Sequence, residues 1–545
     1  MWYRATPTQQ GIWILDRIER LRPTYLIPSV LEFTGPVDHR ALVAAVRATL
    51  ARHPALRARF RLDTVRHRVE YRTDGEPAEA GLIDAVAEEW TPDELARLVE
   101  ALCYTPFELA DEAPARAEVI RVDDEVTLLV LTVHHIVFDA TSRAIVVDEI
   151  VARYQAALRG EELVPPPAPH PADVLGEPAP EAVAEQVAAA ARRLRGAPTD
   201  VELPYALAPH EDFSMVGALA HTAFDASLSE RVLKLAAEEG CTAFMAGVAL
   251  LAGALARRGG QRDFLFAVVW PGRDDPASLD VVGMFMTTLV LRITVEETTS
   301  WRELLGRARV AGMETFVDAD VPLDALAAEL DAERDVGRLP LTPVLVNLAD
   351  AAGPVDLAPG VVGRYRPLDP QYSKWDLALF VHVEEDAGGP RLELSLDHPA
   401  ALFDDAAISE LLTALRRGVA DLAHSPEDPV LKPVTEEGNI NDPAARLDLV
   451  RAVWREVLKT DQVEDDVSFF DAGGDSLRLV VLVERLREVS GLKVRTVDLF
   501  RAGTVRGQAD LLGSLGGAEA ESSGGSSRER LLGAVRSRRA TESPG

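Results

Sequence analysis

The sequence predicts an α/β protein made of two lobes of related build, followed by a small helical domain. In two long stretches, segments with helical hydrophobic spacing alternate with strand-like segments, and a proline-rich segment at 162–180 separates the stretches. A polar segment at 424–443, rich in proline and glycine, then precedes a region in which only helical spacing recurs. A chain of 545 residues is long enough for more than one hydrophobic core.

The first stretch predicts a helix, a strand pair and a second helix in that order. Residues 39–56 have helical composition and spacing, and residues 117–133 predict two strands around an Asp-Asp turn. Residues 142–158 predict a helix with Thr141 or Ser142 near its N-cap. One face of that helix is apolar and is expected to face the core: Val147, Ile150, Val151 and Tyr154.

The second stretch predicts the same alternation. Residues 229–258 predict two helices, and residues 404–423 predict a closing helix. The strands expected between them are 263–273, 283–295, 342–350 and 391–398. We therefore place the lobes at 1–175 and 176–430, with a linker at 431–442.

The third region, 443–515, is about the size of a small helix bundle. Asp442-Pro443 is a good helix start, because proline suits the first helical position. Two apolar stripes with helical spacing follow: Val450, Val453, Trp454, Val457 and Leu458, and then Leu479, Leu482, Val483 and Leu486. Residues 516–545 have the composition of a flexible tail, whose basic end is either a docking segment for an acidic partner or simply solvated.

Charge and cysteine content exclude several classes of function. The net charge of −31 argues against binding to nucleic acid or to an anionic membrane surface. Only Cys103 and Cys241 are present, without CxxC spacing, so we expect neither a disulfide framework nor a thiolate zinc site. The N-terminus lacks the pattern of a signal peptide, and no apolar run is long enough to span a bilayer. A cytoplasmic location is expected.

The stretch FFDAGGDSLRLVVLVERL, 469–486, is the most specific one in the chain. Its two glycines permit a tight turn, and Asp475-Ser476 then begins an amphipathic helix whose start favours a phosphate. With the helix before it and the segment after it, the stretch resembles the acyl or peptidyl carrier domain of thiotemplate synthases. The resemblance covers 443–515 and implies a four-helix bundle with 4′-phosphopantetheine attached to Ser476.

The stretch LTVHHIVFDATS, 131–142, places two histidines where an apolar strand ends. Adjacent residues of a strand point to opposite faces, so His134 and His135 cannot easily bind one metal ion together, and we predict no metal site. We expect His134 to be a structural core residue. His135, beside a loop, is placed to accept a proton near neutral pH. Asp139 either holds the loop or pairs with a distant arginine.

HHIVFDA resembles the HHxxxDG motif of nonribosomal peptide synthetase condensation domains, and further motifs of that family follow its order. They are TPTQQGIWIL (6–15), RHPALRARF (52–60), VVGMFMTTLVLR (281–292), DADVPLDAL (318–326) and RDVGRLPLTPVLVNL (334–348). The resemblance spans 1–430. It implies two chloramphenicol acetyltransferase-like lobes that form a V-shaped pseudo-dimer, with a tunnel between them.

The family's functional residues carry over by position. The resemblance implies that His135 is catalytic, that Asp139 is structural, and that Arg292 is the arginine that pairs with Asp139. It places Asn347 in the lining of the tunnel. The sequence also departs from the family pattern at three positions: Ala140 replaces a glycine, Thr287 replaces an asparagine and Gly11 replaces an arginine. These departures concern the acceptor side of the site, where the methyl of Ala140 would crowd the approach or require a less strained backbone.

The function implied is amide bond formation between a carrier-bound acyl or peptidyl thioester and an amine tethered to Ser476. The implied partners are an upstream donor carrier protein, a phosphopantetheinyl transferase, and an adenylation enzyme acting in trans, because no adenylation-like region is visible. Two alternatives stay open. The chain could transfer a carrier-bound acyl group to a free alcohol or amine, or it could be a catalytically silent domain that recruits other enzymes. Heterocyclisation is disfavoured by the histidine pair, and epimerisation by the downstream position of the carrier region.

Overall fold

The computed structural model describes residues 1–176, 180–206, 215–319, 321–332, 340–349, 353–366, 368, 372–386, 388–431, 443–458, 460, 463–474, 476–490 and 494–515. The chain divides into two compact units, Met1–Leu431 and Lys432–Gly545. The predicted tail at 516–545, and the predicted linker beyond Leu431, lie outside the described residues.

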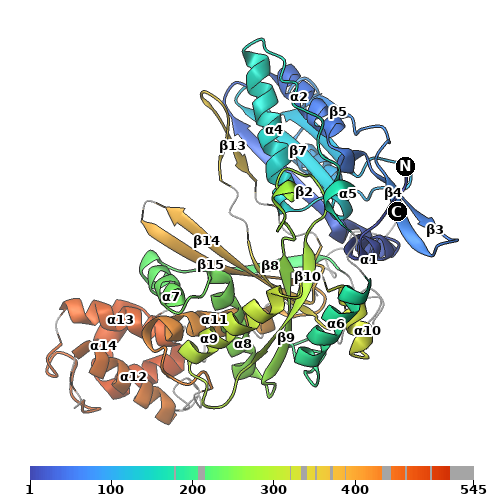
Figure 1. The fold of residues 1–545 in the computed structure, drawn as a ribbon. Coiled ribbons are helices and arrows are strands. Elements are labelled where there is room, and N and C mark those ends of the chain that lie inside the picture. The colour runs from blue at the N-terminus through green and yellow to red at the C-terminus, as the bar shows by residue number, and fades with distance from the viewer. Residues whose placement is uncertain are drawn as a thin grey trace, which may run out of the picture. The chain divides into compact units, whose positions relative to one another are not determined.

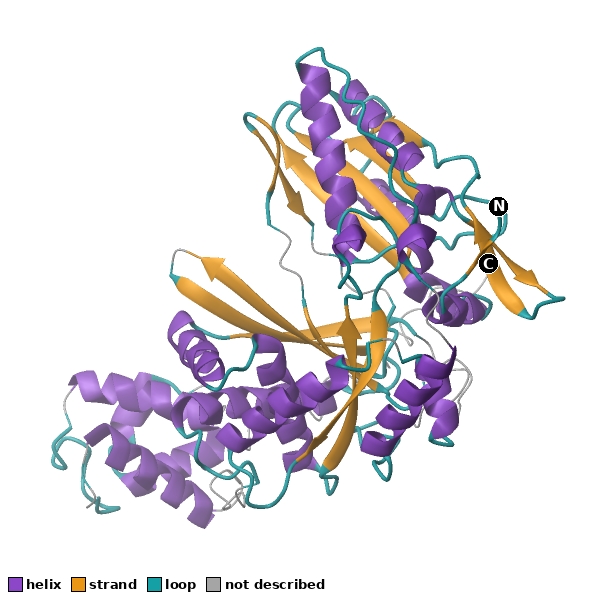
Figure 2. Ribbon diagram, in the orientation of Figure 1, coloured by secondary structure: helices purple, strands orange, loops and turns teal. Residues whose placement is uncertain are grey.

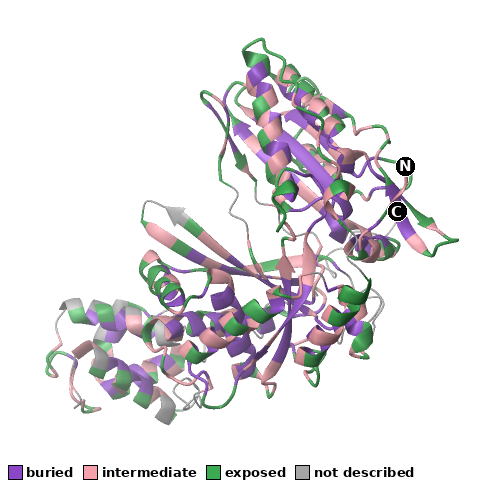
Figure 3. Ribbon diagram, in the orientation of Figure 1, coloured by how far each residue is buried: buried purple, intermediate pink, exposed green. Residues whose placement is uncertain are grey.

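The first sheet of unit Met1–Leu431 has the described strand order β12-β13-β2-β7-β6-β5 (Figure 1). Its strands are β2 (Leu26–Thr34), β5 (Ala80–Asp84), β6 (Ala115–Arg121), β7 (Val126–His134), β12 (Val355–Ala358) and β13 (Val361–Tyr365). The predicted strand pair at 117–133 is confirmed as the antiparallel pair β6 and β7. β7 lies between β2 and β6, and it is buried over nearly its whole length (Figure 3).

Helices cover both faces of this sheet (Figure 2). They are α2 (His39–Arg52), α3 (Pro92–Tyr104) and α4 (Ala140–Leu158). Leu129, Leu131 and Val133 of β7 join the same core cluster as residues of α2 and α4. Leu128 and Val130 point the other way, into a cluster with residues of α3. Two-sided burial explains why β7 is an almost unbroken apolar run instead of an alternating one.

Helix α4 is the helix predicted at 142–158, but its N-cap is Asp139 and not Thr141 or Ser142. The Asp139 carboxylate accepts a hydrogen bond from the Ser142 backbone N–H at 2.8 Å. Aspartate is among the best N-cap residues because its carboxylate satisfies a free backbone N–H group. Of the predicted apolar face, Val147, Ile150 and Tyr154 are buried.

The second sheet has the described order β10-β9-β11-β14-β15-β8. Its strands are β8 (Gly217–Ala223), β9 (Asp263–Trp270), β10 (Thr287–Thr294), β11 (Val344–Leu348), β14 (Leu377–Asp386) and β15 (Gly389–Pro399). The accompanying helices are α6 (Pro180–Leu194), α7 (Ala226–Glu238), α8 (Ala243–Arg258), α9 (Trp301–Phe316), α10 (Leu323–Glu329) and α11 (Asp405–His424). Helix α8 is buried from Met245 to Ala256, because α9, α11 and the sheet surround it.

The chain crosses between the sheets in a way that sequence order does not indicate. Strands β12 and β13 come from the second half of the chain, yet β13 pairs antiparallel with β2 and extends the first sheet. Tyr365 lies opposite Leu31 in this register. A small sheet of order β1-β4-β3 lies beside the first one; its strands are β1 (Tyr3–Arg4), β3 (Arg59–Asp63) and β4 (Arg68–Arg72). The remaining short elements of this unit are α1 (Pro7–Leu15), α5 (Pro171–Val174), η1 (Glu19–Tyr25), η2 (Pro54–Arg57), η3 (His135–Val137) and η4 (Pro276–Ser278).

The second unit is helical in its described part. It contains α12 (Pro443–Leu458), α13 (Ser476–Ser490) and α14 (Thr496–Arg501), and residues 505–515 are also helical. Both predicted apolar stripes contribute to one core around Trp454 and Phe469. The indole N–H of Trp454 donates a hydrogen bond to the side-chain oxygen of Gln508 at 2.8 Å, so its polar atom is satisfied inside that core.

No single helix in the described ranges is long and apolar enough to cross a membrane. Helices α7 and α8 pass a length and composition test only as a pair, which is bent by 104°.

Candidate active site

The two histidines lie at the point where β7 ends and the short 3-10 turn His135–Val137 begins. His134 is fully buried, and its ring contacts polar groups on both nitrogens. Nδ1 accepts a hydrogen bond from the Ile136 backbone N–H at 3.1 Å, and Nε2 lies 3.2 Å from a carboxylate oxygen of Asp16. Because Nδ1 accepts, Nε2 carries the proton that it donates to Asp16. His134 therefore fixes the turn and has no free nitrogen for catalysis.

Helix α1 holds the histidine turn from the other side. The buried side chain of Gln9 donates a hydrogen bond to the Ile136 carbonyl oxygen at 2.9 Å. Asp16, at the C-cap of the same helix, is the partner of His134. Both residues lie in or next to the stretch 6–15, which the sequence identified only by resemblance. Nothing in their spacing from His135 indicated this contact, because it joins residues more than a hundred positions apart.

Unlike His134, His135 has one ring nitrogen, Nε2, that can accept a proton. Its Nδ1 lies 2.8 Å from the Phe138 carbonyl oxygen, which can only accept, so Nδ1 carries the proton and Nε2 has a free lone pair. Burial lowers the pKa of His135 to about 3, with further contributions from the positive charge of Lys374 and from His134. The imidazole is therefore neutral at neutral pH, and Nε2 can accept a proton or a hydrogen bond.

Asp139 lies at the start of α4, and its carboxylate binds an arginine and two backbone groups. Arg273 donates from Nη2 to both carboxylate oxygens, at 2.8 and 2.9 Å. The backbone N–H groups of Ser142 and Phe285 also donate to Asp139. Both side chains of the ion pair are about 5% exposed or less. These contacts give the Asp139 carboxylate a structural role, because it joins the start of α4 to Arg273 and Phe285.

Arg273 and Ser142 complete a set of polar contacts between the two sheets, which we call the Asp139 cluster (Asp139, Ser142, Arg273 and Gly283). The Ser142 hydroxyl donates to the Gly283 carbonyl oxygen at 2.9 Å and accepts from the Gly283 N–H at 3.0 Å. Arg273 also donates to the Val281 carbonyl oxygen at 2.9 Å. The loop after β9 is thereby fastened to the N-terminus of α4, one residue away from the histidine turn.

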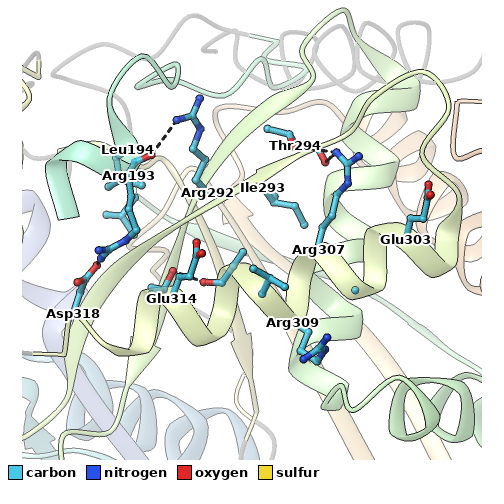
Figure 4. Close-up of a pocket in the computed structure, with 15 residues that line it drawn as sticks. Arg193, Leu194, Arg292, Ile293, Thr294, Glu303, Arg307, Arg309, Glu314 and Asp318 are labelled. Atoms are coloured by element: carbon cyan, nitrogen blue, oxygen red, sulfur yellow. Dashed lines mark hydrogen bonds and ion pairs between the residues drawn. The ribbon is translucent and has the colours of Figure 1, made fainter. Parts of the chain in front are cut away.

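The expected pairing of Arg292 with Asp139 is wrong. Arg292 lies on β10 and pairs with Asp263 on the neighbouring strand, with N–O distances of 2.6 and 3.0 Å. It lines an open depression of about 590 Å³ between β10 and α9, which neither His135 nor Asp139 lines (Figure 4). Arg273 has the role assigned to Arg292. Arg273 lies in the loop that joins β9 to β10, whereas Arg292 lies near the far end of β10, and only the fold decides which one reaches the histidine turn.

The positions that depart from the family pattern are accommodated without strain. Ala140 is the exposed first residue of α4, and its φ is not positive, so its methyl group requires no special backbone. A Cβ atom added to Gly11 would meet nothing within 4 Å. Thr287 is the first residue of β10, and Asn347 lies opposite Phe380 in the pairing of β11 with β14; both are half-buried.

The carrier unit places Ser476 at the first position of α13, a helix of 15 residues. Gly473, three residues before it, has a φ of 96°, a backbone conformation in which a side chain would be strained. Gly474 donates to the Phe469 carbonyl oxygen at 2.8 Å, and the Phe469 ring leaves no room for a Cβ atom there. This tight turn before a long helix fits a phosphate attached to Ser476, because free N–H groups at a helix start favour a phosphate. Among the described residues, no group of three His, Cys, Asp or Glu side chains could hold a metal ion.

Comparison with known proteins assigns both units to known families. Residues 2–437 match the family model of the condensation domain, and residues 448–512 match that of the phosphopantetheine attachment site. The isonitrile lipopeptide synthase of Mycobacterium tuberculosis is 30% identical over 439 residues, which are 77% of this chain and 17% of that protein. The phosphinothricin tripeptide synthetase PhsC of Streptomyces viridochromogenes is 29% identical over 436 residues, 76% of this chain and 38% of that protein. The chain thus spans well under half the length of these curated relatives.

Solved structures share the fold of the first unit. The X-domain from teicoplanin biosynthesis aligns with a TM-score of 0.69 and 23% identity, over 78% of this chain and 96% of that one. The first condensation domain of the calcium-dependent antibiotic synthetase, in complex with a substrate analogue, aligns with a TM-score of 0.65 and 22% identity, over 79% of this chain and 98% of that one.

Proposed function

Because this chain belongs to the condensation-domain family and carries a phosphopantetheine attachment domain behind it, we propose that it forms amide bonds in nonribosomal peptide synthesis. The donor is an acyl or peptidyl thioester on an upstream carrier protein, and the acceptor is an amine tethered to Ser476. The observation that carries the proposal is the free Nε2 of a neutral His135, next to the buried Asp139 cluster.

His135 and the arm attached to Ser476 account for the proposed chemistry as follows. The 4′-phosphopantetheine arm on Ser476 supplies a thiol that holds the acceptor as a thioester. His135 orients the acceptor amine through Nε2, and it accepts the proton that the amine loses as its nitrogen attacks the donor carbonyl carbon. The C–S bond of the donor thioester then breaks, and the proton passes to the departing thiolate. Holding both reactants on tethers makes the step effectively unimolecular, which supplies most of the rate enhancement.

The supply of substrates follows from the same chemistry. We propose that a phosphopantetheinyl transferase modifies Ser476 and that an adenylation enzyme acting in trans loads the arm. The two described cysteines, Cys103 and Cys241, are buried free thiols, which suits the reducing cytoplasm in which such enzymes would meet this chain.

Intact-mass spectrometry of the full chain tests the proposal. After treatment with a phosphopantetheinyl transferase, wild type is expected to gain one phosphopantetheinyl group, and Ser476→Ala none. With a loaded donor carrier, the product is expected to remain attached to Ser476, and His135→Ala should lower the transfer rate about 10²–10⁴-fold.

Other outcomes would favour the alternatives. Product released from a free amine or alcohol, with Ser476 carrying the donor, would identify an acyltransferase with a soluble acceptor. No transfer to any acceptor by a fully modified chain would favour a recruitment domain. A relative in fold, the X-domain from teicoplanin biosynthesis, forms a complex with OxyB.

A further inference from the structure

Lys374 brings a positive charge from the second half of the chain to the histidine site. It lies three residues before β14, and its ammonium is 5.2 Å from the centroid of the Tyr25 ring. Tyr25 directly precedes β2, whose first residue, Leu26, lies opposite His134 in the pairing with β7. The charge of Lys374 acts on both histidines, and it is the second-largest cause of the lowered pKa of His135 after burial. The half-buried Lys374 therefore lies beside the end of β2 and β7 at which the histidine turn begins.

Asp397 is the carboxylate whose charge acts on Lys374, and it raises the pKa of the ammonium against the effect of burial. Asp397 accepts a hydrogen bond from the Ser373 hydroxyl, and burial raises its pKa to about 6. Asp16 accepts from His134 and lies 3.8 Å from Arg22. Among the described residues, none forms a hydrogen bond or a close ion pair with the Lys374 ammonium.

A half-buried ammonium that makes no close ion pair is only partly compensated in the folded protein, and a ligand can supply the missing partner. Burial lowers the pKa of Lys374 to about 8, so the group is still mainly charged at neutral pH. His135 cannot serve as the source of positive charge at the site, because it is neutral there and its Nε2 accepts. The reaction itself creates a negative charge in this region when the amine attacks the carbonyl carbon.

We propose that the Lys374 ammonium stabilises the oxyanion that develops on the donor carbonyl oxygen during acyl transfer at His135. This inference rests on the proposed function. The amine lone pair forms the C–N bond, and the carbonyl π electrons move to the oxygen, which becomes the oxyanion beside Lys374. The amine proton goes to Nε2 of His135 and then to the departing thiolate, while Lys374 keeps its protons throughout. A fixed charge in a poorly solvated site stabilises such an oxyanion without having to reorganise.

The test compares Lys374→Met and Lys374→Arg with wild type and with the control Lys234→Met, which removes an exposed lysine of α7. Each full-length chain is modified at Ser476 and assayed with a loaded donor carrier, using acceptors with a neutral or a carboxylate side chain. Lys374→Met is expected to lower kcat about 10²–10³-fold with both acceptors. The wild-type rate is expected to fall as pH rises through about 8, and this alkaline limb should move to higher pH in Lys374→Arg. The thermal unfolding of Lys374→Met checks that the variant is folded, and Lys374→Arg provides the pH test if it is not.

Each result separates the inference from the proposed function. If wild type makes no amide with any acceptor, the proposed function fails. If wild type is active, an unchanged kcat and pH profile in Lys374→Met overturns the role of Lys374. A raised KM limited to acceptors with a carboxylate side chain also overturns it, because the ammonium would then bind a substrate carboxylate instead of the oxyanion.

Discussion

Removing Arg273 and Arg292 one at a time gives the sharpest test of the site. Arg273→Met and Arg292→Met each remove one guanidinium and leave an apolar side chain of similar reach. The structure predicts different outcomes, because Arg273 and Asp139 are 4% and 5% exposed, whereas Arg292 and Asp263 are 30% and 24% exposed. The first substitution leaves a carboxylate buried without its main partner, and the second leaves one that water can reach.

The magnitudes follow from this burial. Removing one partner of a buried ion pair costs about 3–5 kcal/mol of the free energy of unfolding. An exposed pair is worth about 0–1 kcal/mol. Arg292 also donates to the carbonyl oxygens of Arg193 and Arg195, which places its loss at the upper end of that range. For activity, loss of Arg273 releases the loop after β9 from α4, and a small misplacement of the site can lower the rate about 10²-fold.

The assay measures the thermal unfolding of the full chain and the rate of acyl transfer for both variants. We expect Arg273→Met to lower both the unfolding temperature and the transfer rate clearly, and Arg292→Met to leave the rate within a few-fold of wild type. The double variant Asp139→Asn with Arg273→Met is the control. Removing both charges should be less destabilising than the sum of the single changes, because no unpaired buried charge remains. Equal losses of rate in the two arginine variants would refute the assignment of Arg273.

Three further predictions concern the histidine turn and the carrier. Because the folded pKa of His135 lies near 3, below its unfolded value of about 6.5, the unfolded chain binds more protons between these values. The free energy of unfolding should therefore fall as pH drops from about 6.5 towards 3, and denaturant titrations should show a shallower fall in His135→Gln. Gln9→Leu should leave the Ile136 carbonyl oxygen without its hydrogen bond, which should lower the free energy of unfolding by about 1–3 kcal/mol. Acyl transfer should slow in this variant, and phosphopantetheinylation of Ser476 should hardly change. Gly474→Ala should destabilise the carrier unit by about 1–3 kcal/mol, because the added methyl group would clash with Phe469. We expect slower modification of Ser476 in this variant, whereas the unfolding of the first unit should not change.

Much of the fold follows from local sequence patterns. The strand pair at 117–133, the helix after it and the helix pair at 229–258 appear where hydrophobic spacing predicts them. Helix α4 begins at Ala140, two residues before the predicted start, because Thr141 and Ser142 are also good caps and only the backbone geometry selects Asp139. Strands β12 and β13 could not be assigned to the first sheet, because strand pairing is a long-range property that no local period encodes.

The sequence by itself determined the alternation of elements, the position of the histidine pair at the end of an apolar strand, and the serine at the start of an amphipathic helix. These depend on periodicity, on capping and on backbone freedom, which act over a few residues. Only the tertiary structure decided that Arg273 and not Arg292 holds Asp139, that Gln9 and Asp16 fix the histidine turn, and that Lys374 lies over the Tyr25 ring. Such contacts join residues far apart in the chain, and burial makes each of them strong or weak, so their partners are known only once the chain is folded.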